Sequence, residues 1–201
     1  MNKEYFQNYK WLNESNVVFI DNSMIIDATA KSDFFCNNGA VSQSGITPES
    51  LCNAPFFYTE ISGDFVFSVK VSHEFCDTYD SASIMIMKDQ NTWAKSCFEK
   101  TDFNTHAVVS VVTNKTSDDA NGCNIDGNEV WLKAVRVSNS FSFHYSITGE
   151  QYFMTRFFNL PVDEIIKVGF VAQAPTGNGG KRYYKNVSIE QKTVKNIRYG
   201  E

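Results

Sequence analysis

The stretch from Trp93 to Glu99 holds the residue types best suited to chemistry at a surface. In an extended strand side chains alternate, so Trp93, Lys95, Cys97 and Glu99 share one face. An unpaired Lys or Glu is costly to bury, so these two must find a partner or reach a wet cleft. Two interpretations stay open. One is a Lys95–Glu99 pair on a solvated sheet with the indole over the lysine stem, and the other is a ligand site with Trp93 as an aromatic platform.

Catalysis finds little support in the residue pattern. Glycoside hydrolysis by the usual route needs two carboxylates about 5–9.5 Å apart. Glu99 is one acid, and Asp80 or Asp118 would be the second, yet no spacing in the sequence brings them together. The chain has only three histidines, His73, His106 and His144, and no G-x-S-x-G run that would mark the serine of a triad. We therefore predict no catalytic residue.

The oxygen-rich segment Asp118–Asn128 is the one candidate for a metal loop. Aligning Gly127 with the glycine of an EF-hand puts Gly122 at the first ligand position and Lys133 at the last, so that pattern fails. An irregular calcium loop and a metal-free Asn/Asp/Gly turn both stay open. His73 and Cys76 lack the second pair of ligands that zinc requires. No metal and no cofactor is predicted.

The elements that must position these residues are short strands. In 64–72 and in 141–147 apolar and polar residues alternate with the period of two that a half-buried strand requires. Further strands are predicted at 17–20, 24–28, 56–61, 83–88, 93–100, 107–113, 130–137, 152–158, 166–173 and 183–191. Segments 37–55 and 115–128 are expected to be long loops, and Pro161–Glu164 a helical turn. About twelve short strands joined by turns indicate an all-β sandwich or barrel.

Composition excludes several kinds of partner. The 201 residues include 18 basic and 23 acidic ones, a formal net charge of -5, which does not suit binding to nucleic acid phosphates. Met1–Lys10 is polar, and no apolar run approaches the ~18 residues of a membrane span. The five cysteines show no C-x-x-C spacing, which favours reduced thiols. We expect a cytoplasmic protein without a membrane partner.

A set of short motifs resembles a known family. They are Trp93/Lys95/Glu99, Val111-Val112-Thr113, Ser117-Asp118, Ser32-Asp33-Phe34-Phe35, Asp80-Ser81-Ala82-Ser83-Ile84-Met85-Ile86, Trp131–Arg136 followed by Phe143–Ser146, and Gly169-Phe170-Val171-Ala172-Gln173-Ala174-Pro175. Their order and spacing resemble the domain of unknown function 1349, a concanavalin A-like family that includes proteins named for regulation of enolase. Phe35, Ser83 and Ala174 depart from the family's usual Trp, Gly and Ser. The first departure puts in doubt any ligand contact that the family makes through an indole there.

The resemblance implies one concanavalin A-like domain over residues 1–201, a two-sheet antiparallel jelly-roll sandwich with one polar concave face. On that face alternation would place the candidate ligand-binding residues, which are Trp93, Lys95, Glu99, Arg136, His144, Gln173 and Asp80. For three of these residues a role without a ligand stays open. His144 would be a solvent-facing residue of a polar stripe, Arg136 would pair with Glu99 or Asp118, and Gln173 would be a polar residue at an edge.

Three functions are compatible with this pattern. The first is a lectin-like binding domain that takes a carbohydrate or another small polar ligand on the concave sheet. The second is a regulatory module that interacts with a metabolic enzyme, by analogy with the family's naming. The third is a glycoside hydrolase-like enzyme that uses Glu99. We rank them in that order.

Overall fold

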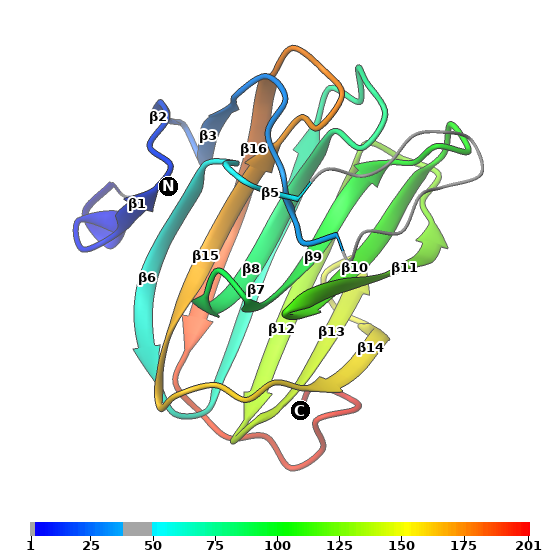
Figure 1. Cartoon of the computed structure of the whole chain (residues 1–201). Helices are drawn as coiled ribbons and strands as arrows, with labels where there is room; N and C mark the ends of the chain where they lie inside the picture. The colour runs from blue at the N-terminus through cyan, green and yellow to red at the C-terminus, as the bar shows by residue number, and fades with distance from the viewer. Residues whose placement is uncertain (1–2, 38–49) are drawn as a thin grey trace.

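The computed structural model of the chain describes residues 3–37 and 50–201. Over these residues the chain forms two seven-stranded antiparallel sheets packed face to face (Figure 1). Sheet A contains, in spatial order, β1 (Lys10–Leu12), β6 (Phe56–Ser62), β15 (Ile165–Gln173), β8 (Ser81–Asp89), β9 (Thr92–Lys100), β10 (His106–Asn114) and β11 (Thr116–Asn124). Sheet B contains β14 (Phe153–Asn159), β13 (Ser140–Ser146), β12 (Glu129–Val137), β7 (Phe65–His73), β16 (Gly180–Glu190), β3 (Ser23–Ala28) and β2 (Val17–Ile20). The predicted two-sheet sandwich is confirmed.

The core lies between the two sheets and follows directly from the alternation. Phe65, Phe67, Val69 and Val71 of β7 all point inward and are at most 1% exposed. They meet inward residues of sheet A such as Phe170, whose ring lies 5.4 Å from that of Phe67 in an edge-to-face arrangement. Because the inner faces take the large apolar side chains, polar residues of sheet A collect on its other side. We call that side the outer face of sheet A.

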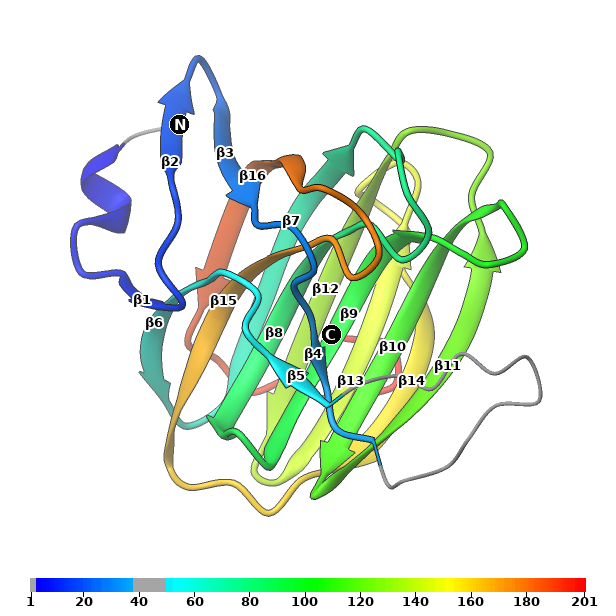
Figure 2. The same cartoon turned by 45° about the horizontal axis from the view of Figure 1, so that its top comes forward.

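A short two-stranded ribbon crosses the outer face of sheet A. It consists of β4 (Phe34–Phe35) and β5 (Leu51–Cys52), which lie in front of β8 and β9 (Figure 2). Ser32 anchors the ribbon by pairing with Ala174 just after β15. Phe34, completely buried, packs its ring edge-to-face on Phe56 and on Trp93, with centroids 6.3 and 6.0 Å away. The ribbon thus covers part of the face that the sequence had marked as a site. Positions 38–49 of the expected loop 37–55 lie outside the described residues.

One predicted loop is a strand. Most of 115–128 forms β11, which pairs with β10 along its length and is the edge strand of sheet A. Its sequence, TSDDANGCN, has no apolar alternation because eight of its nine residues are exposed and none is buried. The pairing with the strongly apolar β10 therefore determines this strand, and its own propensity does not.

The helical turn predicted at Pro161–Glu164 is also wrong. Residues 161–164 are irregular, and the helix that the described part of the chain does contain is a 3-10 turn, η1 (Lys3–Phe6). Residues 3–37 and 50–201 include no helix that is long and apolar enough to span a membrane.

Candidate functional site

The outer face of sheet A carries the four residues of β9 that the sequence singled out. Trp93, Lys95, Cys97 and Glu99 alternate with the inward Ala94 and Phe98, as predicted. The strand register places each between one neighbour from β8 and one from β10. These neighbours are Met85 and Val111 for Lys95, Ser83 and Val109 for Cys97, and Ser81 and Ala107 for Glu99. Glu99 is therefore flanked by small side chains, whereas Lys95 is flanked by larger ones.

Lys95 is the centre of a buried polar network. Its ammonium donates to Asp33 Oδ1 at 2.7 Å and to Gln173 Oε1 at 2.8 Å, and its side chain is only 2% exposed. Burial lowers the pKa of Lys95, but the Asp33 carboxylate, together with Cys97 and Glu99, more than compensates, so the net pKa is raised. The partner of the lysine is Asp33 and not Glu99, which corrects the pair that the sequence suggested. The Ser32-Asp33-Phe34-Phe35 motif was the signal for this partner.

Trp93 does not present an open ring. It is completely buried under Phe34, and its indole N–H donates to the Gln90 carbonyl at 3.1 Å. The Lys95 Nζ lies 5.8 Å from the indole centroid, which agrees with the interpretation of an indole packed beside the lysine. The expected aromatic platform at Trp93 is therefore wrong, because ribbon β4–β5 occupies the space above the ring.

Glu99 is the one outer-face residue of this set that lacks a protein partner. Its side chain is 8% exposed, no hydrogen bond or ion pair joins it to another described residue, and its oxygens are not among the fully buried atoms without a partner, so they reach solvent. Burial raises the pKa of Glu99 to about 8. Lys95 opposes this shift, and the nearby carboxylates of Asp33, Asp119 and Asp102 reinforce it. At neutral pH Glu99 is therefore mostly a carboxylic acid, able both to donate and to accept a hydrogen bond.

The rim beside Glu99 contains residues that the sequence interpretation missed. Burial raises the pKa of Tyr79, and Asp102, Glu99 and Asp119 raise it further, so these groups share one electrostatic neighbourhood. The Tyr79 amide donates to the Lys100 carbonyl at 2.7 Å, which ties the 74–80 loop to the end of β9. Phe103, in the turn after β9, is 72% exposed. No motif signalled Tyr79 or Phe103, because loop residues carry no periodicity.

The raised pKa of Glu99 predicts that the free energy of unfolding falls as the pH rises from 5 to 7. The folded state keeps a proton that the unfolded chain releases near pH 4.5, so the stability linked to Glu99 is full below pH 4.5 and falls as the pH rises toward 8. At about 1.4 kcal/mol per pH unit, the loss between pH 5 and pH 7 is roughly 2–3 kcal/mol. Urea unfolding of the wild type and of Glu99→Gln at both pH values measures it. Equal pH slopes for the two proteins would contradict the assignment.

Arg136 does not lie on this face. It belongs to β12 of sheet B, and its guanidinium donates to the backbone carbonyls of Ser138, Asp163 and Glu164, each at 2.8 Å. It thereby ties the loop before β15 to the end of β12. Both expectations for this residue, a shared concave face and a pair with Glu99 or Asp118, are wrong. Asp118 instead pairs with Arg156, at 3.0 Å.

His144 lies on the far side of the molecule, on the outer face of sheet B. The segment after β16 covers it completely, so it is not the solvent-facing residue that the polar stripe suggested. Ser142 donates to the Ile197 carbonyl at 2.7 Å and so accepts from His144 Nε2 at 2.8 Å, which leaves Nδ1 without a hydrogen bond in the described structure. Burial, aided by Lys133, lowers the pKa of His144 to about 4 against the opposing Ile197 carbonyl.

Because the pKa of His144 is lowered, we expect the protein to lose stability in acid. Its folded pKa of about 4 lies below the usual 6.5, so its contribution is full above pH 6.5 and is lost as the pH falls toward 4. Between pH 6.5 and pH 5 the loss is roughly 2 kcal/mol. We expect His144→Gln to remove this part of the acid sensitivity, measured as the change in urea midpoint between the two pH values. An unaltered acid sensitivity in the variant would show that the ring is already charged in the folded state.

Asp80 and Gln173, the remaining two predicted site residues, lie on different faces of sheet A. Gln173 is 1% exposed and on the outer face with Lys95, as predicted. Asp80 is completely buried between the sheets, where its Oδ1 lies 3.3 Å from Arg182 Nη2. Asp80 is thus separated from the outer face, although its backbone carbonyl accepts from the Lys100 amide. Across residues 3–37 and 50–201 no cluster of three or more His, Cys, Asp or Glu side chains is arranged to hold a metal ion.

The two packed antiparallel sheets define a jelly-roll β-sandwich. Residues 11–192 match the family model described as "Protein of unknown function (DUF1349)". The chain belongs to this family, which confirms the resemblance drawn from its motifs.

Three similar proteins place the family among known structures. The chain is 25% identical to the "Regulation of enolase protein 1" of Saccharomyces cerevisiae, over 89% of this chain and 87% of that protein. A crystal structure of a functionally unknown protein from Saccharomyces cerevisiae is similar with a TM-score of 0.81 and 23% identity, covering 94% of this chain and 99% of the other. The carbohydrate-binding module CBM66 from Bacillus subtilis is similar with a TM-score of 0.58 and 10% identity, covering 92% and 97%. At these identities the two solved structures show the fold alone.

Proposed function

We propose that the chain is a non-catalytic binding domain that takes a hydroxyl-bearing polar ligand, such as a saccharide, at the Glu99 end of the outer face of sheet A. The observation that carries the proposal is that Glu99 is buried and makes no hydrogen bond to the described residues. The Glu99 oxygens are not among the fully buried atoms that lack a partner, so they reach solvent and a ligand hydroxyl can approach them. The similarity in fold to a carbohydrate-binding module supports a ligand of this class.

The surroundings of Glu99 supply the other groups that such a ligand needs. A neutral carboxylic acid donates and accepts at once, as a sugar hydroxyl does. The exposed ring of Phe103 offers an apolar surface for sugar C–H groups, in the role first expected of Trp93. On the same face of β9, the polar groups of Lys95, Asp33 and Gln173 are already bonded to one another, so Glu99 is the polar group of this strand left for a ligand.

The contacts of the other acids favour binding over hydrolysis. A glycosidase needs a second carboxylate across the bond from Glu99. Of the acids that the sequence offered for this role, Asp80 lies between the sheets against Arg182, and Asp118 pairs with Arg156. Asp33 is engaged by Lys95. This is why we place the hydrolase hypothesis last.

A ligand screen with three variants tests the proposal. Glucose, xylose, fructose and their disaccharides are screened by thermal shift, and positive ligands are measured by isothermal titration calorimetry. Glu99→Met fills the same volume without hydrogen bonds and should weaken binding at least about tenfold, the equivalent of one lost hydrogen bond. Glu99→Gln, which still donates and accepts, should retain most of the affinity, and Glu150→Gln, an exposed control, should retain all of it. The site would be refuted if every ligand found in the screen bound Glu99→Met as tightly as the wild type.

A regulatory interaction with another protein is the second candidate. The specific observation that favours it is the name of the Saccharomyces cerevisiae relative, which describes regulation of an enolase. Affinity capture with the wild-type chain, followed by mass spectrometry, tests it against the first proposal. A stoichiometric enzyme partner, combined with no response to any saccharide, would favour regulation over ligand binding.

A further inference from the structure

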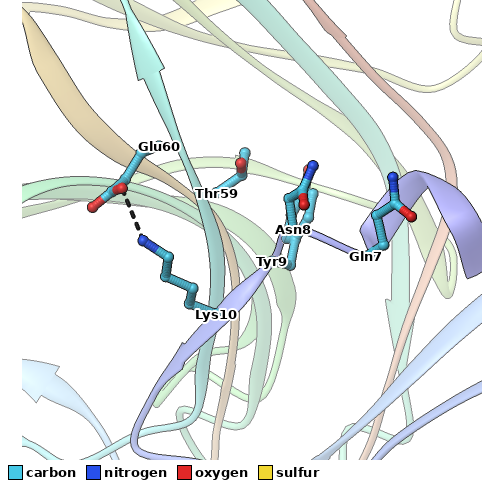
Figure 3. Close-up of a pocket in the computed structure, with 6 residues that line it drawn as sticks. All are labelled: Gln7, Asn8, Tyr9, Lys10, Thr59 and Glu60. Carbon is cyan, nitrogen blue, oxygen red and sulfur yellow. Dashed lines mark hydrogen bonds and ion pairs between the residues drawn. The ribbon is translucent and has the colours of Figure 1, made fainter.

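A hollow lies at the β1 edge of sheet A, three strands away from β9 and Glu99 when counted from β6. It has a volume of about 520 Å³ and is lined by Gln7, Asn8, Tyr9, Lys10, Thr59 and Glu60 (Figure 3). It continues into an adjoining hollow of about 550 Å³ that shares Asn8, Tyr9, Thr59 and Glu60. Its walls come from the η1–β1 segment, from β6 and β15 of sheet A, and from the end of β16 of sheet B. Strands β15 and β8 separate β6 from β9, so this hollow is distinct from the site at Glu99.

Aromatic and aliphatic side chains form the apolar wall of the hollow. The ring of Tyr9 is held by Phe6, Phe57 and Phe170, with centroids 4.9, 5.1 and 6.1 Å away. Tyr5 and Ile165, which line the adjoining hollow, are 47% and 60% exposed. A fixed tyrosine ring beside exposed apolar groups is the kind of surface on which the C–H face of a sugar ring packs.

The polar wall has hydrogen-bonding capacity to spare. Tyr9 Oη is buried and has no hydrogen bond of normal geometry in the described structure, although the Tyr5 hydroxyl is near. Burial, the first cause, and Tyr5 both raise the pKa of Tyr9, so its hydroxyl stays neutral. Asn8 and Thr59 also line the hollow, with Thr59 between Glu60 and Tyr9 in Figure 3, and each adds a side-chain donor and acceptor. These groups match the alternating donors and acceptors of adjacent hydroxyls.

The charges around the hollow cancel. Lys10 Nζ and Glu60 Oε2 form an ion pair at 3.0 Å, and the remaining lining residues are uncharged. A charged ligand would meet no free counter-charge here, whereas the acids around Glu99 create a negative field. The hollow therefore favours an uncharged ring with several hydroxyls.

We propose that this hollow binds a neutral saccharide unit, with Tyr5 and Tyr9 packing on the sugar ring and Asn8 and Thr59 bonding its hydroxyls. The proposal is independent of ligand binding at Glu99. A chain with both sites would contact a polysaccharide at two separated points, or two separate sugars.

Nuclear magnetic resonance with defined sugars tests this site. The probes are glucose, xylose, cellobiose and xylobiose, titrated at millimolar concentration into ¹⁵N-labelled protein, with glucuronate and glucosamine as charged counterparts. We expect shifts of the Asn8, Tyr9 and Thr59 amides with at least one neutral sugar, and weaker ones with the charged sugars. Tyr5→Ala and the double variant Asn8→Ala/Thr59→Ala should each weaken the affinity at least about tenfold. Tyr199→Ala, which removes a tyrosine that is 72% exposed at the other end of the chain, should not.

Two outcomes would overturn the proposal. One is the absence of any shift at these amides with all four neutral sugars. The other is equal affinity of Tyr5→Ala and the wild type for a sugar that does shift them. Glu99→Met separates the two sites, because it should leave binding at the hollow unchanged. A sugar that no longer binds Glu99→Met but still binds Tyr5→Ala would belong to the Glu99 site alone.

Discussion

Replacing Arg182 by Met is expected to lower the free energy of unfolding by about 3–5 kcal/mol, the usual cost of removing one partner from a buried ion pair. Arg182 is completely buried in β16, and its guanidinium reaches across to sheet A. There it donates to the Gln173 carbonyl at 2.8 Å and to the Ser81 carbonyl at 3.1 Å, and lies against Asp80. Without it two carbonyls and a carboxyl group are left buried between the sheets.

Chemical denaturation measures this loss. Lys181→Met, one residue earlier and exposed, is the matched control and should change the free energy of unfolding by no more than about 0.5 kcal/mol. The double variant Arg182→Met/Asp80→Leu should recover part of the loss, because it removes the stranded acid as well. A loss below about 1 kcal/mol for Arg182→Met would show that the pair does not join the sheets as described.

Trp93→Ala is expected to destabilise the fold by about 3–5 kcal/mol, the range for a fully buried aromatic residue. The indole fills the space between Phe34 and the outer face of sheet A, so its removal leaves a cavity under ribbon β4–β5. Trp93→Phe, which keeps a ring, should cost less than about 1.5 kcal/mol.

The same variants separate a structural tryptophan from a binding one. Because Phe34 covers the indole, Trp93→Phe should bind any ligand of the Glu99 site as well as the wild type does. Stability is measured by thermal and urea unfolding, and affinity by calorimetry. Full stability of Trp93→Ala combined with lost ligand affinity would mean that the ring is exposed to ligand after all.

Much of the fold could be predicted from the sequence because alternation is a local signal. Val17–Ile20 was predicted with the bounds that β2 has, and β7 and β9 differ from prediction by about one residue at each end. The edge strand β11 could not be predicted, since its side chains face water on both sides and only its pairing with β10 makes it a strand. The 3-10 turn η1 could not be predicted either, because its four residues are too few to show a helical repeat of apolar positions.

The candidate site was predicted only where one strand carries it. Lys95 and Glu99 share a face because they are two strand periods apart, and alternation alone ensures that. Arg136 and His144 have the same alternation but lie in the other sheet, and no local pattern tells which sheet a strand joins. Asp33 and Tyr79 come from loops, so their approach to β9 depends on the tertiary structure.

The most direct test of the proposed site is an amide chemical-shift map of the ¹⁵N-labelled chain with the saccharide that stabilises it most in the thermal screen. Binding at Glu99 predicts a contiguous set of shifted amides on three adjacent strands, centred on Ser81, Glu99 and Ala107 and extending to Phe103. It also predicts that Glu99→Met removes this set. Shifts that leave these strands untouched, for example a set confined to sheet B, would contradict a ligand site on the outer face of sheet A.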